Sequence, residues 1–457
     1  MFTFIHAADL HLDSPMQKLE QYEGAPVAAL RGATRRALEN LVALAESLPA
    51  DFIVFAGDIF DRDWKDYNTG LFFVQQMARL KAAGIPVFAI VGNHDAASRM
   101  SRSLPYPENV RVLSTTAPET IRLDDFPVAI HGQGYDSPKV TQALVRSYPR
   151  RVEGRFNIGL LHTSADGRPG YDPYAPCSLD DMLSRGYDYW ALGHIHDREI
   201  LHENPHVIFP GNIQGRHVKE AGAHGCMVVR VDDASRADAE FHALDVFRWT
   251  GLSVDVSGAA DGEAALDRAM DAVESALEEA EGRPLAARVA LTGPCPAHEA
   301  LVAESEHWTS RLRAAMLDAA GDRVWLEKIR FRTTPVRERS LPDGPLREVM
   351  AVLDELKADP EAVKELGNEI FSDLARKLPA ELRNGTPAPN PENPDWLKEI
   401  LEASRPLLLH RLRGGSGSGV RSAASAEKNP PRPPFTKGER DDGQPSGRSS
   451  AKTGGAP

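Results

Sequence analysis

The first half of the chain alternates short apolar runs with longer amphipathic segments. Short apolar runs bounded by turn residues predict buried β-strands. The amphipathic segments Ala28–Ser47 and Gly70–Ala83 predict helices. The predicted strands are FTFIHAAD, DFIVFAGD, IPVFAIVGNHD, PVAIHG, FNIGLLH, YDYWALGHIH and HVIFPGN. Alternation of strands and helices predicts an α/β layered domain with a largely parallel, buried sheet.

The rhythm of the pattern changes near Thr250. Three further strands (GLSVDVSG, ARVALTG and RVWLEKIRFRT) are separated by helices at Gly262–Glu281 and Ala297–Ala319. They predict a small βαβαβ unit, an α+β cap. Two more helices follow at Leu346–Leu378 and Pro394–Leu412, joined by TPAPNPENP.

The last part of the chain has a different composition. From Gly414 onward Gly, Ser, Pro and charged residues dominate, which predicts disorder. We therefore divide the 457 residues into an α/β domain (1–245), a cap (246–340), a C-terminal helical segment (341–413) and a disordered tail (414–457).

Composition limits the classes of function. The net charge is −13, with 53 Lys and Arg against 66 Asp and Glu. Any nucleic-acid site must therefore be local, metal-assisted or completed by a partner. The three cysteines form no CxxC pair, which argues against a disulfide scaffold or zinc ribbon and favours a cytoplasmic protein. We expect no signal peptide and no membrane span, since the first residues lack a basic region and no apolar run approaches ~20 residues.

Five predicted strands end in polar residues that can bind metals. These residues are Asp9 and His11 in ADLH, Asp58 in AGDIFD, Asn93, His94 and Asp95 in VGNHD, His162 in GLLH, and His194 and His196 in ALGHIH. The carboxyl ends of parallel strands share one edge of a sheet, so we expect these segments to converge there. The i, i+2 spacing of the DxH and HxH pairs points both side chains the same way if the strand stays extended. The glycines before Asp58, Asn93 and His194 suit tight turns and close backbone approach.

Taken singly, each of these motifs is more often a cap, a turn or a satisfied polar group. Gly-Asp after a strand, for example, is a common turn. The joint pattern, in this order and with each motif at a strand end, predicts a metal site.

The order DxH, GDxxD, GNHD, H and GHxH resembles the calcineurin-like metallophosphoesterases. Within that family, the segments DLHLDSP, GDIFDR and GNHD, and PGNIQGRHVKE after GHIH, are similar to those of the DNA-repair exonuclease branch. That branch contains the SbcD and YhaO-like nucleases. The resemblance covers Met1–Asp232 strongly and the cap moderately. Asp13-Ser14-Pro15 departs from the glycine of the SbcD pattern, which affects the subfamily and not the metal site.

The resemblance implies two metal sites and a proton donor. It implies a first ion bound by Asp9, His11, Asp58 and His196, and a second bound by Asp58, Asn93, His162 and His194. Asp58 would bridge the two ions. His94 would stand beside the phosphate without binding metal, and Asp95 would orient its imidazole. The family implies Mn²⁺, while the O and N donors also suit Fe²⁺ or Zn²⁺.

The implied activity is two-metal hydrolysis of DNA phosphodiester bonds, as an exonuclease in DNA repair. Two divalent ions ~3.5–4 Å apart can hold both the attacking and the leaving oxygen, and a bound water becomes the nucleophile. The implied partners are DNA and a coiled-coil ATPase of the SbcC type; a homodimer stays open. One alternative is a dinuclear phosphodiesterase or phosphatase acting on a small molecule or protein. Another is a non-enzymatic scaffold, which would predict lost ligands, and none is lost.

Several other residues keep two interpretations. His6 and His131 are expected to be core or outer-shell histidines. Whether Asp61 orients a ligand and whether His217 contacts phosphate stay open. A solvated cap face is favoured over a DNA contact for the alternating cations Lys328, Arg330 and Arg332. Two interpretations also remain for an apolar stripe on the last predicted helix: it docks in a groove of a partner protein, or it packs against the other C-terminal helix. The stripe consists of Leu397, Ile400, Leu401, Leu407 and Leu408.

Overall fold

The computed structural model describes residues 1–14, 24–61, 67–98, 104–167, 171–336, 345–377 and 393–412. The predicted disordered tail (414–457), Pro15 and most of the TPAPNPENP connection lie outside the described residues. None of the described helices combines the length and apolar character that a membrane crossing requires.

The first sheet has six strands in the order β12-β11-β1-β2-β3-β4. The strands β1 to β4 pair in parallel, while β11 and β12 are antiparallel additions beside β1. The strands are β1 (Phe2–Ala7), β2 (Phe52–Phe55), β3 (Val87–Ala89), β4 (Val110–Val112), β11 (Gly225–Val231) and β12 (Ala237–Ala243).

The second sheet also has six strands, in the order β5-β6-β7-β8-β10-β9. Its four central strands are parallel and both edge strands are antiparallel. They are β5 (Glu119–Arg122), β6 (Val128–Gly132), β7 (Phe156–His162), β8 (Tyr189–Gly193), β9 (Glu199–Glu203) and β10 (His206–Phe209). The layered α/β fold is confirmed, but the expectation of one sheet is wrong, because the predicted strands divide between two.

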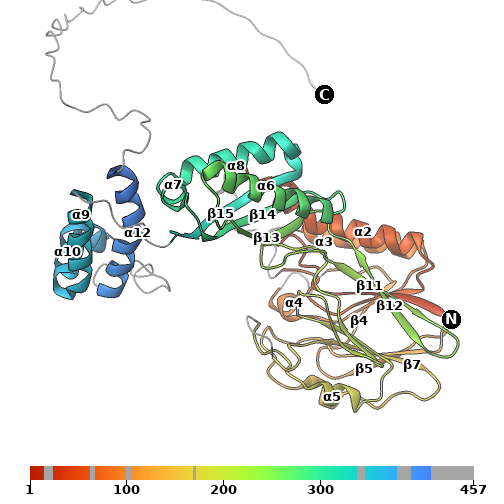
Figure 1. The fold of residues 1–457 in the computed structure, drawn as a ribbon. Helices are drawn as coiled ribbons and strands as arrows, with labels where there is room; N and C mark the ends of the chain where they lie inside the picture. The colour runs from red at the N-terminus through yellow and green to blue at the C-terminus, as the bar shows by residue number, and fades with distance from the viewer. Residues whose placement is uncertain are drawn as a thin grey trace, which may run out of the picture. The chain divides into compact units, whose positions relative to one another are not determined.

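The two sheets pack face to face over an apolar core (Figure 1). Phe4 and Phe52 of the first sheet stack with their ring centroids 5.2 Å apart, and Tyr189 of the second sheet meets Phe4 edge-on at 5.1 Å. Alternate residues of the same strands, such as Ile5 and Phe55, face the other way into a second core. Strands that are buried on both faces explain the continuous apolar runs of the sequence.

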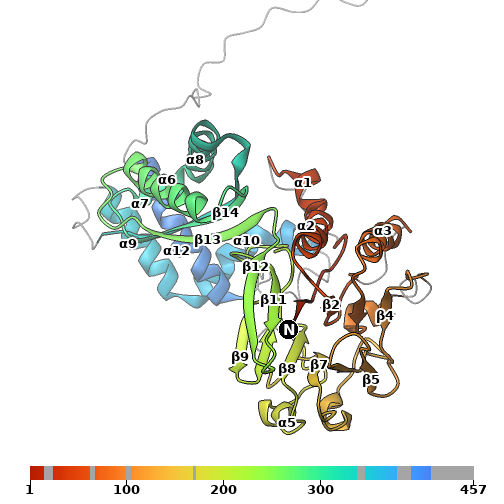
Figure 2. The ribbon, with the colours of Figure 1, turned by 90° about the vertical axis from the view of Figure 1, so that its right-hand side faces the viewer.

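Helices cover the outer face of the first sheet (Figure 2), whereas connecting segments with short helical turns cover that of the second. The first sheet is covered by α2 (Ala33–Ser47) and α3 (Asn68–Ala82), and α1 (Val27–Arg31) precedes them. The single helix predicted at Ala28–Ser47 is therefore two helices, which meet at Gly32, the residue with the poorest helix propensity in that segment. Short elements α4 (Asn93–Ala97), η3 (Leu144–Ser147) and α5 (Leu179–Leu183) lie in the connections.

The cap has the predicted βαβαβ order. Its parallel strands are β13 (Arg248–Asp255), β14 (Leu285–Pro294) and β15 (Val324–Thr334). The crossovers are α6 (Gly262–Glu279) and, where one helix was expected, α7 (His298–Ala303) and α8 (Ser305–Ala320), followed by η4 (Gly321–Arg323). These helices cover one face of the sheet. On the other face Trp249 and Trp325 pack against Leu30 of α1. The exact domain boundaries stay predictions.

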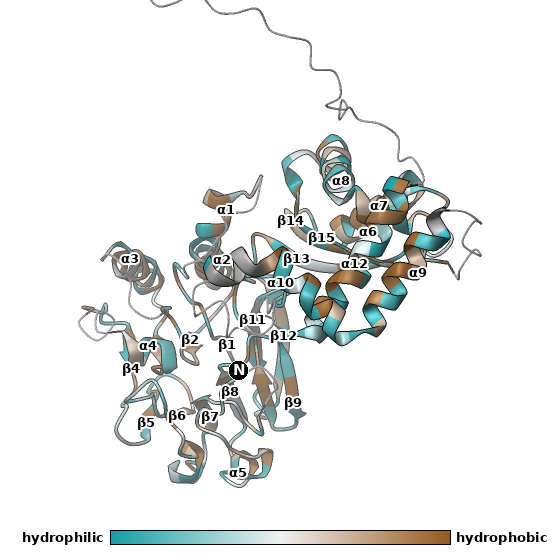
Figure 3. Ribbon diagram, turned by 90° about the vertical axis from the view of Figure 1, so that its left-hand side faces the viewer, coloured by the Kyte–Doolittle hydropathy of each residue, from teal (hydrophilic) through white to brown (hydrophobic). Residues whose placement is uncertain are grey.

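The helical segment contains α9 (Pro345–Ala358), α10 (Pro360–Lys377) and α12 (Pro394–Leu412). The predicted helix Leu346–Leu378 is broken at Asp359, whose carboxylate accepts the N–H groups of Glu361 and Ala362 and caps α10. Within the apolar stripe of α12, Leu397 is buried against Gly367 of α10, whereas Leu407 is 40% exposed. Hydrophobic stretches mark α9 and α12 in Figure 3.

Candidate metal centre

The predicted metal ligands gather where the strands of both sheets end. Asp9 and His11 follow β1, Asp58 follows β2 and Asn93 follows β3, all in the first sheet. His162 is the last residue of β7, and His194 and His196 follow β8, all in the second sheet. The site is therefore built across the seam between the two sheets.

The backbone of this site is left-handed at the positions of four predicted ligands. The φ angles of Asp9, His11, Asp58 and His194 are 52°, 43°, 52° and 100°. Strand β1 ends at Ala7 and strand β8 at Gly193, so the condition set for the i, i+2 pairs, that the strand stays extended, is not met. Such φ values are costly for residues with a Cβ, and they cluster at functional sites. The Asp9 N–H donates to the Gly57 carbonyl and the His11 N–H to the Asp58 carbonyl, each at 3.0 Å, which holds these segments together.

All three of the predicted glycines, Gly57, Gly92 and Gly193, allow close approach at the site. A Cβ added at Gly92 would overlap the Asp58 carboxylate, and one at Gly193 would overlap the Ala56 carbonyl. Gly57, with φ 95°, would place a Cβ 2.6 Å from His162 Nδ1. The close packing predicted from these glycines is confirmed.

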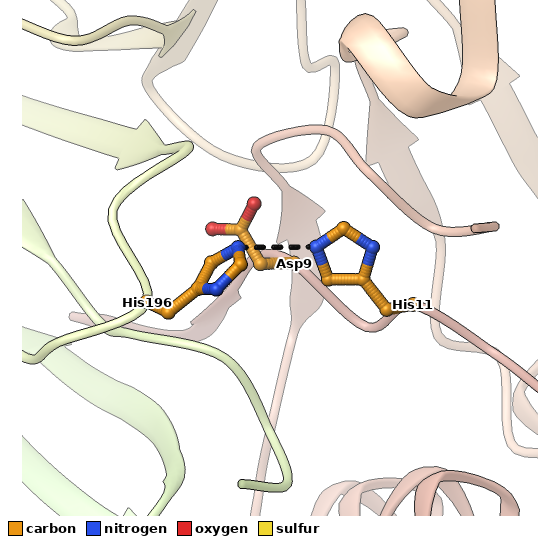
Figure 4. Close-up of side chains that lie close together, drawn as sticks. All are labelled: Asp9, His11 and His196. Carbon is orange, nitrogen blue, oxygen red and sulfur yellow. Dashed lines mark hydrogen bonds between the residues drawn. The ribbon is translucent and has the colours of Figure 1, made fainter. Parts of the chain in front are cut away.

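Within the part of the chain that the structure describes, three groups of side chains bring possible ligand atoms within 4.8 Å of one another. The first contains Asp9, His11 and His196. His11 and His196 face each other with their Nε2 atoms 3.1 Å apart, beside the Asp9 carboxylate (Figure 4). Both Asp9 oxygens accept the His194 N–H, at 2.9 and 3.1 Å, which fixes the carboxylate between the two sheets.

Asp58 belongs to both of the other groups. One group joins it to His11 and His94, and the other joins it to Asp9 and His162. Its Oδ2 lies 3.9 Å from His11 Nε2 and 3.5 Å from His162 Nε2. A carboxylate between two sets of donors is the position that a bridging ligand requires.

The chemistry of His162 tests whether these residues fit a metal ion. Its Nδ1 donates to the Ala56 carbonyl oxygen at 2.9 Å, so in the neutral ring Nε2 carries a lone pair. This Nε2 faces Asn93 Oδ1 at 2.9 Å and Asp58 Oδ2 at 3.5 Å. Lone pairs that converge in this way repel one another unless a cation lies among them. The donor set therefore fits a divalent metal.

The pKa shifts of the buried carboxylates and imidazoles also favour a bound metal ion. Burial raises the pKa of Asp9 and of Asp58, and each carboxylate also feels a nearby carboxylate. Burial lowers the pKa of His11, and it lowers those of His162 and His194 to about 3. Neutral imidazoles are the form that binds metals, and a cation would offset the cost of the buried carboxylates.

His194 belongs to none of the three groups. Its Nε2 lies 3.1 Å from the Asp172 carbonyl oxygen, which leaves Nδ1 as the nitrogen that could bind an ion. The rings of His194 and His162 are 5.2 Å apart. Its assignment to the second metal stays a prediction.

The carboxylate that holds His94 is Asp61. His94 Nδ1 lies 2.5 Å from Asp61 Oδ1, and Ser14 Oγ donates to Asp61 Oδ2 at 2.6 Å. Burial alone would raise the pKa of Asp61, but these hydrogen bonds outweigh it and lower the pKa to about 2. Asp61 is thus ionised and keeps the proton of His94 on Nδ1. The Asp61 carboxylate therefore orients His94, which is not an assigned metal ligand, and whether Asp61 also orients a ligand stays a prediction.

Asp95, which the sequence assigned to orient His94, has a different set of bonds. Its carboxylate accepts the backbone N–H groups of Ile59, Phe60 and Gly92 at 2.8 to 3.2 Å. Asp95 thereby caps α4 and ties it to the segment after Asp58. Burial, with Asp58 nearby, raises its pKa to about 7.

The sequence interpretation missed Glu220 and Arg216. Glu220 Oε1 lies 2.7 Å from His196 Nδ1, and the Arg216 guanidinium donates to the same oxygen at 2.9 Å. Burial would raise the pKa of Glu220, but the hydrogen bond from His196 and the charge of Arg216 lower it strongly. The signal was present in GRHVKE, where the two residues are spaced i, i+4 directly after the last strand of the second sheet.

The remaining histidines fall outside the three groups. His6 is buried between the Tyr189 hydroxyl and the Leu192 carbonyl, and His131 bonds to Thr120 and Asn157, so both are core residues as expected. The side chain of His217 is 56% exposed, with Nε2 3.8 Å from Glu220. A phosphate contact by His217 stays a prediction.

Comparison with protein families matches two parts of the chain. The pattern of the calcineurin-like phosphoesterases matches residues 2–198. The pattern described as metallophosphoesterase YhaO, middle domain, matches residues 249–334. The second match covers the cap sheet and its helices.

Comparison with individual proteins gives two kinds of relative. The chain is 36% identical over 298 residues to the uncharacterized metallophosphoesterase YhaO of Bacillus subtilis, covering 64% of this chain and 72% of that protein. It is 26% identical over 290 residues to the DNA double-strand break repair protein Mre11 of Methanopyrus kandleri, covering 55% and 59%. Among solved structures, a dimetal phosphatase from Danio rerio aligns over 53% of this chain and 99% of that one, with 13% identity and a TM-score of 0.32.

Proposed function

Because the chain belongs to the calcineurin-like metallophosphoesterases, we propose that it hydrolyses phosphodiester bonds of DNA with two bound divalent metal ions, as an exonuclease in DNA repair. The observation that carries this proposal is the Asp58 carboxylate, whose Oδ2 lies 3.9 Å from His11 Nε2 of one proposed donor set and 3.5 Å from His162 Nε2 of the other. One shared carboxylate between two donor sets is the arrangement used for in-line displacement at phosphorus.

The proposed ligands divide between the two ions as the sequence predicted. Asp9, His11, Asp58 and His196 would hold one ion, and Asp58, Asn93, His162 and His194 the other. Bound there, the ions would activate water and stabilise charge on the phosphate oxygens. Mn²⁺ is the proposed metal, and the mixed O and N donors also suit Fe²⁺ or Zn²⁺.

His94 supplies the proton in this proposal. Its side chain is 22% exposed, so a phosphodiester can reach it. Asp61 fixes one proton on Nδ1 and stabilises the charged imidazolium, and Nε2–H would donate to the departing sugar oxygen. The backbone N–H of His94 also donates to Asp58 Oδ1 at 2.8 Å. This bond couples the position of the proton donor to the bridging carboxylate.

DNA is preferred over a small phosphodiester because of the relatives. The similarity to the Mre11 protein of Methanopyrus kandleri extends over 290 residues, more than the 197-residue match to the phosphoesterase pattern. The chain spans about half to three fifths of the length of the Mre11 proteins that it matches. Substrate and partners are therefore proposals for this chain.

A coiled-coil ATPase of the SbcC type is the proposed protein partner, with the helical segment as its docking site. In support, α12 exposes Leu407, which lines a hollow of about 420 Å³ together with Ser404, Leu408 and Arg411. An apolar helix face of this kind suits helix-in-groove recognition.

The decisive experiment compares three substrates with the same purified chain. End-labelled duplex and single-stranded DNA and bis-p-nitrophenyl phosphate are each incubated with Mn²⁺, with EDTA as the blank. We expect metal-dependent cleavage of DNA that begins at an end. Hydrolysis of the small ester without any DNA cleavage would instead identify a small-molecule or protein phosphoesterase. No hydrolysis of any substrate, despite two bound ions, would favour a scaffold.

A further inference from the structure

The cap sheet has a face that its helices do not cover. Residues paired across neighbouring strands project to the same face, and the apolar series Val289, Leu291, Ile329 and Phe331 packs toward α6, α7 and α8. The alternate residues of β15 therefore point to the opposite, open face. They are Lys328, Arg330 and Arg332, paired with Arg288, Ala290 and Thr292 of β14.

The three cations of β15 are available for a ligand. Lys328 and Arg332 are exposed and Arg330 is half-buried. Among the described residues, none of the three takes part in a hydrogen bond or ion pair with another side chain. Other cap arginines are engaged: Arg311 pairs with Glu263, and Arg288 forms a two-pronged ion pair with Glu327. Three unneutralised positive charges in a chain of net charge −13 mark a local anion-binding surface.

The strand geometry suits a repeating anion. Alternate residues on one face of a strand are ~7 Å apart, so the three cations form a row ~13 Å long. A row of single charges at regular spacing matches the successive phosphates of one extended nucleic-acid strand better than it matches a compact anion. The neighbouring side chains Ala290 and Thr292 are small, which leaves the row accessible.

Residues 215–220 form a short segment that contacts both the metal centre and the open face of the cap sheet. Arg216 and Glu220 contact His196 at the metal centre, and Val218 lies between them in sequence. Val218 packs against Trp249 and Trp325 at the start of the open face, and its Cγ2 lies 3.8 Å from where Gly251 would carry a Cβ. Trp249 Nε1 donates to the Gly215 carbonyl at 3.1 Å, which fixes this segment to β13.

We propose that Lys328, Arg330 and Arg332 bind the sugar–phosphate backbone of a DNA strand whose reacting phosphate lies at the metal centre. This assignment rests on the proposed function and adds to it a reason why a polynucleotide is preferred over a small ester. Contacts to phosphates carry no sequence information, so the surface would hold any sequence.

The test uses the full chain with Arg330→Gln and Arg332→Gln combined. Binding of a labelled 20-nucleotide single strand is measured by fluorescence anisotropy with Ca²⁺ in place of Mn²⁺, across a series of salt concentrations. Loss of two phosphate contacts should weaken binding roughly 10- to 50-fold at 0.1 M salt and reduce the slope of log affinity against log salt by about 1.4. Hydrolysis of bis-p-nitrophenyl phosphate with Mn²⁺ should be unchanged.

The matched control combines Arg230→Gln with Arg236→Gln. It removes the same charge from strand β11 and the turn before β12, near the N-terminal end of β1 and away from the metal centre. We expect DNA binding by this control to equal that of the unaltered chain. Equal weakening in both double variants would overturn the site, because it would reflect net charge alone.

The outcomes for the two proposals differ. If the unaltered chain cleaves DNA and the Arg330/Arg332 variant binds it equally well, the surface assignment is wrong and the proposed function stands. If the unaltered chain binds DNA but cleaves only the small ester, and the variant binds more weakly, the surface stands and the nuclease function is wrong. Absence of DNA binding by the unaltered chain overturns both. Tighter binding of an acidic peptide than of DNA would overturn the choice of DNA.

Discussion

His94 and Asp61 form a hydrogen-bonded pair in which Nδ1 of the imidazole lies 2.5 Å from Oδ1 of the carboxylate. The pair stands at the rim of a metal centre in which Asp9, His11, Asp58, His162 and His194 are buried. Because Asp61 bonds Nδ1, Nε2 is the nitrogen that would donate a proton to a substrate. The pair resembles the histidine–carboxylate arrangements that hold general acids and bases in place.

Replacing His94 tests proton donation separately from metal binding. His94→Ala should lower DNA cleavage ~10²–10⁴-fold, because a sugar oxygen leaves poorly without a proton. Hydrolysis of bis-p-nitrophenyl phosphate should suffer much less, since its leaving group needs no proton. Both rates and the bound metal are measured on one preparation.

Asp61→Asn is the matched control for His94→Ala. It keeps the imidazole but removes the charge that stabilises the imidazolium, so it should give a smaller loss on DNA. Equal losses on both substrates with full metal content would indicate that His94 stabilises phosphate charge. Loss of an ion from His94→Ala would make His94 a ligand, as its grouping with His11 and Asp58 allows.

Replacing the bridging carboxylate should affect every substrate. Asp58→Asn should lower hydrolysis of DNA and of the small ester by more than the ~10–100-fold typical for loss of an outer partner of a metal site. Metal content by atomic spectroscopy should fall below two ions per chain. Near-normal activity with two bound ions would show that the ligand assignment is wrong.

Glu220 gives a prediction about metal affinity. Its carboxylate fixes the proton of His196 on Nδ1 and so leaves Nε2 free to bind an ion. Glu220→Gln should weaken one of the two Mn²⁺ sites ~10–100-fold in a calorimetric titration. Glu203→Gln, at an exposed position of β9, is the control and should bind both ions normally. An unaltered titration in Glu220→Gln would mean that the hydrogen bond does not tune the ligand.

His6 gives a prediction about pH and stability. Its burial lowers its pKa to about 3, below the value of about 6.5 expected when unfolded. The unfolded chain therefore binds the proton first as the pH falls from 6.5 towards 3, and the folded state loses stability over that window. Urea unfolding in EDTA should show the difference between the unaltered chain and His6→Gln shrinking by roughly 1–2 kcal/mol from pH 7 to pH 5. A constant difference would contradict the assignment of His6 as a neutral buried group.

The sequence predicted the elements of the fold better than their arrangement. Strand-end motifs such as GNHD and GHIH marked the site because apolar runs end where polar ligands begin. The division into two sheets was missed, since strand order depends on long-range pairing that no local pattern carries. The polar edge strand β12 (ADAEFHA) has one face exposed and gave no apolar run.

Contacts between residues far apart in the sequence also explain where the site differs from the predictions. The family resemblance assigned Asp95 to orient His94, whereas the Asp95 carboxylate accepts the Gly92 N–H and caps its own helix. Asp61 approaches His94 from another segment, 33 residues away. The left-handed backbone at Asp9 and His11 was also invisible, because these are not glycines and the strand pattern continues up to them.

Because the metal centre lies between the two sheets, bound ions would stabilise the packing of the sheets as well as take part in hydrolysis. Asp9, His11, Asp58 and Asn93 follow strands of one sheet, and His162, His194 and His196 lie at the ends of strands of the other. In the proposed assignment each ion would therefore bind ligands from both sheets and would add to the apolar core and the hydrogen bonds, such as His194 N–H to Asp9, that already join them. A ligand that binds only the packed sheets adds RT ln(1 + [L]/Kd) to their cohesion. Removal of the ions by a chelator would therefore weaken the association of the two sheets. The weakening would occur at the edge where the metal centre lies, and hydrolysis would be lost at the same time.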